Sequence, residues 1–542
     1  MFDVHASADF PLNRRSTLGL LALLLGGPVH AQAALANGGV EDIRNHGAKG
    51  DGRTIDSPAI NRAVQAAAKR GGGIVLVPPG RYLSFSIRLL DRVTLALSAG
   101  AVIEAADPDL HGRNYDPPEN YLEEQFQDFG ITHVHNSLIY ADGATDIGVI
   151  GPGMLHGLGL DREGPGDRWW KRDNWQSAKA LGMSPKEFML RDPNEAAQVG
   201  RANKTIGLMN CRNVQLKDFT ILQAGHFGII AHGCSAMQLD GIVIDTDRDG
   251  IDIDCCRDVR VTNCIVNAPK DDAIVLKSSY ALGRKVMCED IVIQGCKTSG
   301  YQMGSLLDGS YRLSDYRAPD DIGVLGRIKM GTETNGGFRN VRISDCICTN
   351  TRGILIGIVD GGVMEDVSVS GINLRDPVNH PLFVHHGTRM RAPKGTPVGA
   401  IRRVRFSDVQ VSGADYRYPC GVEGFADGPV EDVTFQGVEV ASSGGGTAAD
   451  AAREPEYRRE TSLEVSYLKT LPAQGIYARY ARRLTVRDCR FTTDATDARP
   501  TVALRHVAGA VIDGLESGKA RAAAVSQRDS SGVAVGDVRV LA

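Results

Sequence analysis

A short pattern of alternating apolar residues returns along most of the chain and restricts the folds that the chain can adopt. Each copy begins with Asp or Asn, continues as apolar, any residue, apolar, and reaches Cys or another small apolar residue after two more positions. The apolar anchors Val214, Met237 and Val259 are 23 and 22 residues apart, and Val341 precedes Val367 by 26. Clear copies occupy residues 258–264, 290–296 and 340–346.

Alternation with a period of two indicates β-strands, and strands that recur at this interval indicate a solenoid. Each rung would hold about three short strands, stacked in parallel on the next rung about 4.8 Å away. We therefore predict an all-β fold, a right-handed parallel β-helix. A β-propeller needs repeats of about 40–45 residues, and leucine-rich repeats need a Leu-x-x-Leu framework that is missing here.

The 11 cysteines fit this fold better than they fit a disulfide framework. An odd count leaves at least one cysteine unpaired. The inward residues of a β-helix form apolar ladders, in which Cys packs well as a small hydrophobe. We predict that Cys264, Cys296, Cys346 and Cys489 are stacked thiols in the core.

The first residues are typical of an export signal. Asn13-Arg14-Arg15-Ser16-Thr17-Leu18 precedes an apolar run that ends at Leu25, and Ala31-Gln32-Ala33 forms a small-x-small cleavage site. This layout predicts a twin-arginine signal over residues 1–33 and a periplasmic or secreted protein. A plain secretion signal with two chance arginines would have the same result. The run is shorter than the about 20 residues that span a bilayer, so we predict no membrane span.

The remaining chain divides into a cap and a rod. Residues 34–90 would form the N-terminal cap and first rungs, and residues 91–542 the catalytic β-helix. Asp56-Ser57-Pro58 predicts the start of a helix and Gly71-Gly72-Gly73 its end, and this helix would cover the open edge of the solenoid. Long intervals between repeats predict loops that shape a cleft. They span residues 155–204, with all three tryptophans, and residues 302–326, 375–400 and 442–475.

Aspartates gather on two successive rungs. Six lie between Asp245 and Asp258, and Asp271-Asp272 follows on the next rung. Counted from the anchor of each rung, His226, Asp249 and Asp271 all lie 12 residues on, so we expect them in one column with Asp272 beside it. Like charges one rung apart push their pKa values apart, which leaves one carboxyl protonated and another ionised. Glycoside hydrolysis needs such a pair, an acid for the leaving oxygen and a base for water.

Two other interpretations of these aspartates stay open. Aspartates also populate turns, where their side chains bond to nearby backbone, and we assign Asp245, Asp254 and Asp258 to turns. Carboxylates are also the ligands that Ca²⁺ prefers, so the cluster would alternatively hold a calcium ion.

The two rungs resemble a known pair of motifs. Residues 247–252, Asp-Arg-Asp-Gly-Ile-Asp, and 271–277, Asp-Asp-Ala-Ile-Val-Leu-Lys, are similar to the Asn-Thr-Asp-Gly and Asp-Asp-x-Ile-x-x-Lys motifs of the polygalacturonase family, glycoside hydrolase family 28. Residues 47–52 and 78–82 also resemble the start of its bacterial members. The resemblance covers most of residues 43 to about 440. It implies an inverting hydrolase of galacturonate-containing pectin, with Asp249, Asp271 and Asp272 as the catalytic carboxylates.

The chain departs from that family in two places. The family's Gly-His-Gly follows the Asp-Asp rung, whereas residues 299–304 contain no histidine here. The family's Arg-Ile-Lys sits one rung further on than Arg327-Ile328-Lys329 does in this chain. Residues 331–337 after it resemble a Gly-Ser-Glu segment of bacterial exo-acting members. We therefore expect a divergent relative, and the long loops suggest exo-action.

Six further residues are predicted to bind substrate. Arg327 and Lys329 alternate outward on a strand, so both would reach a uronate carboxylate, and solvated surface charge is the alternative. Glu333 would be a further acid or a sugar contact. His385-His386 lies in a predicted loop without metal spacing, so we expect it at the surface or against substrate. The complete predicted set is His226, Asp252, Lys277, Arg327, Lys329 and Glu333.

Three functions from different classes remain. The leading hypothesis is an exported glycosidase, without a cofactor, whose partner is a pectic polysaccharide or oligosaccharide, either galacturonan or rhamnogalacturonan. The second is a polysaccharide lyase that uses Lys or Arg as base and Ca²⁺ held by Asp247, Asp249 and Asp271. The third is a non-catalytic carbohydrate-binding or adhesin β-helix. The net charge of −4, from 61 basic and 65 acidic residues, gives no sign of a nucleic acid or anionic membrane as partner.

Overall fold

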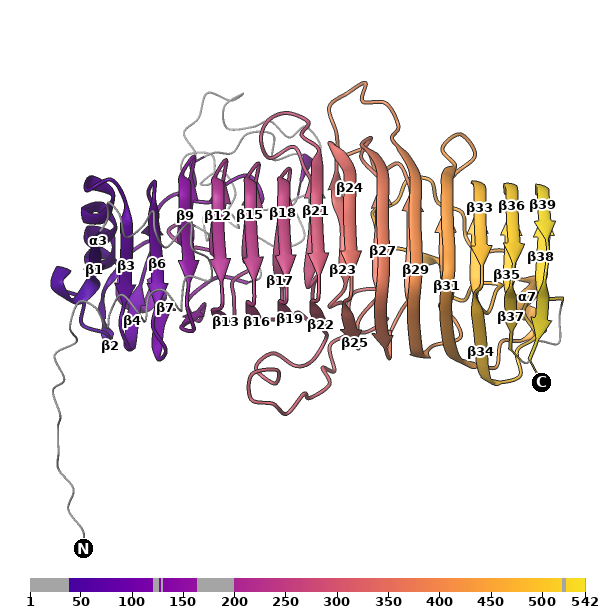
Figure 1. Ribbon diagram of the computed structural model, residues 1–542, viewed down its shortest axis with the longest axis horizontal. Helices are drawn as coiled ribbons and strands as arrows, with labels where there is room; N and C mark the ends of the chain where they lie inside the picture. The colour runs from indigo at the N-terminus through magenta and orange to yellow at the C-terminus, as the bar shows by residue number, and fades with distance from the viewer. Residues whose placement is uncertain (1–38, 120–125, 128–129, 163–198, 519–522, 542) are drawn as a thin grey trace, which may run out of the picture.

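The computed structural model describes residues 39–119, 126–127, 130–162, 199–518 and 523–541. The predicted export signal and the three tryptophans lie outside these ranges. Within them the chain forms one long rod, and chain order is rung order from the N-terminal to the C-terminal end (Figure 1). The pairings between the named strands of these ranges are all parallel, and the fold is the predicted right-handed parallel β-helix.

The rod has three long faces of stacked strands. The first face is a separate 13-stranded sheet, here called the site face. Its strands are β5 (Ile87–Arg88), β8 (Ser137–Asp142), β11 (Lys204–Met209), β14 (Phe227–His232), β17 (Asp249–Asp254), β20 (Ile274–Ser278), β23 (Ile328–Thr334), β26 (Ile354–Ile358), β28 (Leu382–His386), β30 (Cys420–Glu423), β32 (Ile476–Arg479), β35 (Val502–Arg505) and β38 (Val525–Arg528).

The second face carries the repeat anchors. Its strands are β1 (Val40–Asp42), β3 (Gly73–Val77), β6 (Val93–Leu97), β9 (Thr145–Ile150), β12 (Arg212–Lys217), β15 (Ser235–Asp240), β18 (Arg257–Thr262), β21 (Cys288–Gln294), β24 (Gly337–Ser344), β27 (Val363–Arg375), β29 (Ala400–Ala414), β31 (Val430–Gly444), β33 (Ala481–Arg487), β36 (Ala508–Asp513) and β39 (Ser531–Val535).

The third face is made of shorter strands, and the long β27, β29 and β31 continue into it. Its other strands are β2 (Asp51–Ile55), β4 (Gly80–Ser84), β7 (Ala101–Ala105), β10 (Met154–His156), β13 (Thr220–Leu222), β16 (Val243–Asp245), β19 (Ile265–Asn267), β22 (Lys297–Ser299), β25 (Ile347–Thr349), β34 (Arg490–Ala495), β37 (Leu515–Ser517) and β40 (Val538–Val540).

The predicted anchors stack on one another. Val214 pairs with Met237, and Met237 pairs with Val259. The residue before each anchor lies in the left-handed region, as Asn213 and Asp258 do at φ 55°. Asn and Asp tolerate this conformation better than most residues, which explains why so many copies of the repeat begin with one of them.

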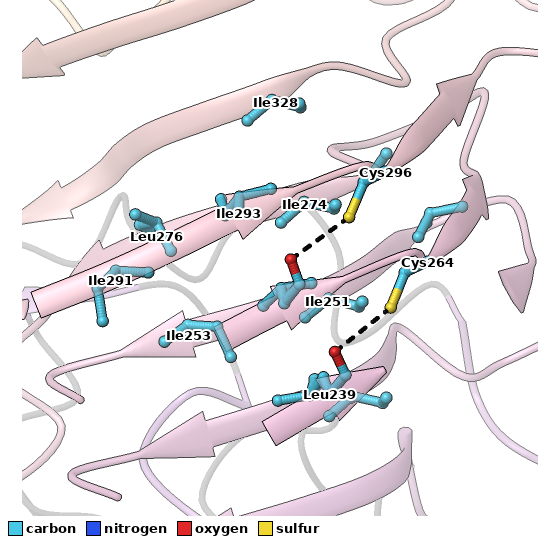
Figure 2. Packing of buried hydrophobic residues seen from close by; sticks show 14 of the residues in the cluster. Leu239, Ile251, Ile253, Cys264, Ile274, Leu276, Ile291, Ile293, Cys296 and Ile328 are labelled. Atoms are coloured by element: carbon cyan, nitrogen blue, oxygen red, sulfur yellow. Dashed lines mark hydrogen bonds between the residues drawn. The ribbon is translucent and has the colours of Figure 1, made fainter. Parts of the chain in front are cut away.

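Ladders of apolar side chains fill the interior of the rod. Figure 2 shows Ile251, Ile274 and Ile328 above one another on successive site-face strands, with Cys264 and Cys296 stacked beside them. All 11 cysteines are buried and free, so the predicted thiol ladder is confirmed. The thiols donate to carbonyls of neighbouring rungs; Cys296 Sγ, for example, lies 3.5 Å from the Val261 oxygen.

The predicted capping helix is α3 (Ser57–Lys69), at the N-terminal end of the rod (Figure 1). Its apolar stripe of Ile60, Ala63, Val64 and Ala67 is buried against the first rungs. The other helical segments are η1 (Ile43–His46), α4 (Pro108–His111), α7 (Ala448–Ala452) and η4 (Ser466–Leu468). None of the helices in the described ranges is long and apolar enough to cross a membrane.

The predicted loops differ in outcome. Residues 163–198 of the first lie outside the described residues. The interval 302–326 does connect β22 to β23, but the interval 375–400 contains a strand, β28, so its prediction as a single loop was wrong. The interval 442–475 carries α7 and η4. It packs on the site face, where Leu463, Val465 and Leu468 form a small apolar cluster with Leu355 and Phe383.

Candidate active site

The candidate site is built on three adjacent strands of the site face, β17, β20 and β23, and on the residues directly before β20 and β23. Phe227 pairs with Asp249, and Ile251 pairs with Ile274. Two residues before the pairing of Ile251 with Ile274, the same register places Asp249 next to Asp272. The prediction had placed Asp249 next to Asp271, so the observed register differs by one residue. The predicted cluster nevertheless forms, because one polar atom each of His226, Asp249 and Asp271 lies within 4.8 Å of the others.

Asp249 is buried beside Lys277. Lys277 Nζ lies 3.5 Å from Asp249 Oδ2 and also contacts Asp252 Oδ1. Burial, followed by the negative charges of Asp252 and Asp271, raises the pKa of Asp249 well above its ordinary value. Burial likewise raises the pKa of Asp252, although Lys277 opposes the shift. Asp249 therefore keeps its proton to a higher pH than an ordinary aspartate does.

Asp271 is in the opposite electrostatic environment. Its side chain is 24% exposed, and Arg248 Nη2 lies 3.1 Å from its Oδ2. Burial would raise the pKa of Asp271, but the charge of Arg248, helped by Lys329 and Lys277, holds it below its ordinary value. Asp271 is therefore suited to be ionised where Asp249 is protonated.

His226 holds Arg248 in this position. Its Nε2 lies 3.0 Å from Arg248 Nη2, and its Nδ1 lies 3.1 Å from the Arg162 carbonyl oxygen. Burial, with Arg248 as the next cause, lowers the pKa of His226 to about 3. A neutral imidazole that donates from Nδ1 and accepts at Nε2 satisfies both contacts.

Asp272 is clamped by the next rung. Arg327 Nε donates to Asp272 Oδ1 at 2.5 Å, and Lys329 Nζ lies 3.2 Å from Asp272 Oδ2. Both cations point out from the rod interior, as predicted, but they are buried, so they are not solvated surface charges. Ile328 pairs with Ile274, which puts Arg327-Ile328-Lys329 on the rung directly after Asp271-Asp272.

A fifth carboxylate, Glu464, reaches the cluster from the 442–475 segment. Arg327 donates to both of its oxygens, with Nη1 3.0 Å from Oε2. Lys329 Nζ and Arg352 Nη1 each lie 3.6 Å from it. Sequence reasoning did not identify Glu464, because no motif marks it and its contact with Arg327 spans 137 residues.

Two sequence-based expectations need correction. Glu333 is completely buried on β23 and pairs with Arg391 at 2.7 Å, so a direct sugar contact does not follow from its position. His385 and His386 lie on strand β28 and are buried, not in a surface loop. His385 Nδ1 lies 3.4 Å from Glu423, and His386 Nδ1 lies 2.9 Å from the Gly428 oxygen.

Two aspartates assigned to turns are also buried on strands. Asp245 accepts from Asn267 Nδ2 at 2.9 Å, and Asp254 pairs with His232 at 2.8 Å. Asp258 does occupy an exposed left-handed position next to its anchor. Asp245 and Asp254 are each the last residue of a strand, and their side chains bond across rungs where a local turn contact was predicted.

The cluster is chemically better suited to a guanidinium than to Ca²⁺. Arg248 Nη2 already contacts both His226 and Asp271, two of the three groups that approach one another closely enough to hold a metal. Asp247, which the lyase hypothesis needs as a ligand, pairs with Lys270 at 3.0 Å. A bound Ca²⁺ would have to displace or face these cations, at a Coulomb cost in a buried site.

The comparisons with known proteins agree with the fold. A family model described as rhamnogalacturonase A/epimerase, pectate lyase-like, matches residues 41–110. A probable polygalacturonase from Vitis vinifera is 25% identical over 344 residues, which make up 61% of this chain and 59% of that protein. The match thus spans less than two thirds of the relative's length.

Two solved structures share the architecture. The family 28 exopolygalacturonase of Yersinia enterocolitica superposes with a TM-score of 0.55 at 16% identity, over 92% of this chain and 78% of that one. The polygalacturonase of Erwinia carotovora ssp. carotovora gives 0.50 at 16% identity, over 72% and 90%. At such identities the likeness concerns the fold alone. Taken together, these matches show that the chain shares the β-helix fold of the two polygalacturonases, that its first rungs match the rhamnogalacturonase A/epimerase model, and that it has 25% identity to a probable polygalacturonase.

Proposed function

We propose that the protein is a glycoside hydrolase that cleaves uronic-acid-containing pectic polysaccharide. The observation that carries the proposal is the opposite protonation preference of two carboxyls whose closest atoms lie within 4.8 Å. Asp249 would protonate the leaving glycosidic oxygen, and ionised Asp271 would take a proton from the attacking water. Asp272, held by Arg327 and Lys329, would orient that water.

Water as the nucleophile, and hence inversion, is supported by the contacts of Asp271 and Asp272. Both oxygens of Asp272 face cations, and Asp271 Oδ2 faces Arg248, which makes either carboxylate a poor covalent nucleophile. The short distance between Asp249 and Asp271 favours retention of the anomeric configuration. Retaining enzymes separate their two carboxyl groups by about 5–5.5 Å, and inverting enzymes by about 6.5–9.5 Å. The anomer first released, read by NMR, decides between them: inversion yields the anomer opposite to that of the cleaved bond.

Exo-action is supported by the 442–475 segment. It covers the site face just beyond β23, where Leu463 packs with Leu355 and Phe383. Because the segment covers the site face on one side of the carboxylates, only a few sugar units fit between the carboxylates and the segment. An exo-acting enzyme releases one short product from the start of the reaction, whereas a ladder of intermediate oligomers would contradict this part of the proposal.

Activity is tested on a panel of galacturonan and rhamnogalacturonan, with and without EDTA. We expect reducing ends without the ultraviolet absorbance of a conjugated double bond. We expect D249N and D271N to lower kcat by about 10²–10⁴-fold, because each removes one proton-transfer group. The matched control D258N changes an exposed aspartate of the same tract at a left-handed position that Asn tolerates, and should keep full activity.

Other results would favour the other hypotheses. Absorbance that EDTA abolishes would identify a calcium-dependent lyase and make the aspartates metal ligands. Binding without any product would identify a carbohydrate-binding β-helix.

We also propose export through the twin-arginine pathway, supported by Arg14-Arg15 and the cleavage site after Ala33. N-terminal sequencing of protein recovered outside the cytoplasm should begin at residue 34. Replacing both arginines by Lys should retain the protein inside the cell, and unchanged export would indicate a plain secretion signal.

A further inference from the structure

The cations beside Asp272 are already neutralised by the protein itself. Arg327 and Lys329 share Asp272, and both also contact Glu464. A third cation, Arg352, donates two hydrogen bonds of 2.6 and 2.7 Å to Asp320. Its Nη1 also lies 3.6 Å from Glu464 Oε2.

Three cations and three carboxylates thus form a closed set, which we call the Arg327 cluster. It consists of Arg327, Lys329, Arg352, Asp272, Asp320 and Glu464. The formal charges of these six residues sum to zero. A uronate carboxylate arriving here would therefore find no excess positive charge to bind.

The group that the Arg327 cluster presents to solvent next to the clamped Asp272 is a carboxylate. The side chains of Arg327, Lys329 and Arg352 are at most 4% exposed, whereas that of Glu464 is 35% exposed. Although burial opposes ionisation, Arg327 and Lys329 lower the pKa of Glu464 to about 2. Glu464 is therefore anionic at any pH at which a pectic substrate carries its own charge.

Packing keeps Glu464 in this position. Its neighbours Leu463 and Val465 are buried in the apolar cluster on the site face. Gly331 and Gly357 make room for Leu463, because a Cβ at either position would lie 2.2 Å from its side chain. The alternation along 463–465 puts the two apolar side chains on the rod and the carboxylate against the cations.

We propose that the sugar-binding position beside Asp272 takes an uncharged sugar, and that Glu464 determines this specificity. The inference rests on the proposed function and deepens it. An ionised Glu464 accepts hydrogen bonds from sugar hydroxyls and repels a uronate carboxylate. A pectic chain that combines neutral and acidic sugars satisfies this requirement, whereas an unesterified chain of uronates does not.

The test separates charge from shape. The probes are a short oligogalacturonate and its methyl ester, which differ in charge at every uronate, and binding is measured by calorimetry on the full chain with D249N to prevent turnover. E464Q leaves the Arg327 cluster with one excess positive charge. The measured quantity is the ratio of the affinity for the acid to the affinity for the ester. We expect this ratio to be at least 10-fold higher in the protein with both D249N and E464Q than in the protein with D249N alone.

Two controls keep the result interpretable. E464D preserves the charge, and E460Q removes an exposed charge from the same segment; both should leave the acid-to-ester ratio unchanged. An unchanged ratio in E464Q would overturn the proposal. So would an equal loss of both probes with a lowered Tm, which would assign Glu464 a purely structural role.

Failure of the hydrolase proposal and failure of the Glu464 proposal can be told apart. If D271N and the unmodified chain prove equally inactive on every polysaccharide, the hydrolase proposal fails. The ratio measured with E464Q still reports whether Glu464 excludes a uronate from this position.

Discussion

At the scale of single residues, the protein separates two aspartates by giving them different neighbours. Asp249 lies among other carboxylates, and Asp271 faces Arg248 at 3.1 Å. Burial disfavours ionisation at both, so the neighbouring charge decides which one keeps its proton. Activity that needs protonated Asp249 and ionised Asp271 should rise and then fall with pH.

This predicts the effect of R248Q on the pH profile. Removing a positive charge beside Asp271 disfavours its ionised form, so its pKa rises, and the acidic limb of kcat/KM should move to higher pH by about 1–3 units. The alkaline limb, which Asp249 governs, should move less. R312Q, in an exposed pair with Asp308, serves as control. An acidic limb that stays in place would mean that Asp271 is not the group that must ionise.

At the scale of elements, the 442–475 segment behaves as a separate layer docked on the site face. Its contacts with the strands beneath include an apolar cluster around Leu463, the ion pairs of Glu464 and hydrogen bonds to side chains of the rod such as Arg479. Rungs of a solenoid are stabilised mainly by their neighbours, so this layer can detach while the rod remains folded.

We therefore predict that L463A loosens the segment locally. Loss of a buried leucine costs about 2–5 kcal/mol, which should appear as faster hydrogen exchange over residues 448–475. The urea midpoint of the rod should change little. The control L313A removes a leucine that is 70% exposed on another loop. A parallel loss of protection in the rungs would show that the segment and the rod unfold as one unit.

At the scale of the whole molecule, the core runs without interruption from the N-terminal cap to the last rungs. The thiols contribute to it along a large part of the rod, from Cys211 to Cys489, and each is buried and free. Burial in apolar surroundings disfavours the thiolate, the reactive form of cysteine.

This predicts the reactivity of the 11 cysteines. A thiol reagent should modify none of them in the folded protein and all 11 in denaturant, without prior reduction. Mass spectrometry of the intact chain counts the modified sites. If fewer than 11 cysteines are modified in denaturant, and a reductant brings the number back to 11, the chain contains disulfides and the predicted ladder of free thiols is contradicted.

The amino-acid sequence by itself determined the β-helix, the register of its repeat anchors and its thiol ladder. These depend on period-two alternation and on Asn or Asp at left-handed positions, which are local properties of the chain. It also predicted that His226, Asp249 and Asp271 lie together, since similar spacing along a solenoid becomes proximity in space, although the strand register differs from the predicted one by one residue.

Only the tertiary structure decided which charges face one another. Asp249 lies in register with Asp272 because this rung is one residue longer between its site-face strands than between its anchors. Glu464 reaches Arg327 because Leu463 finds space above Gly331 and Gly357, on the adjacent strands β23 and β26, which lie more than 100 residues before it in the chain. Such contacts depend on how side chains pack between segments far apart in the chain, and no short motif or spacing records them.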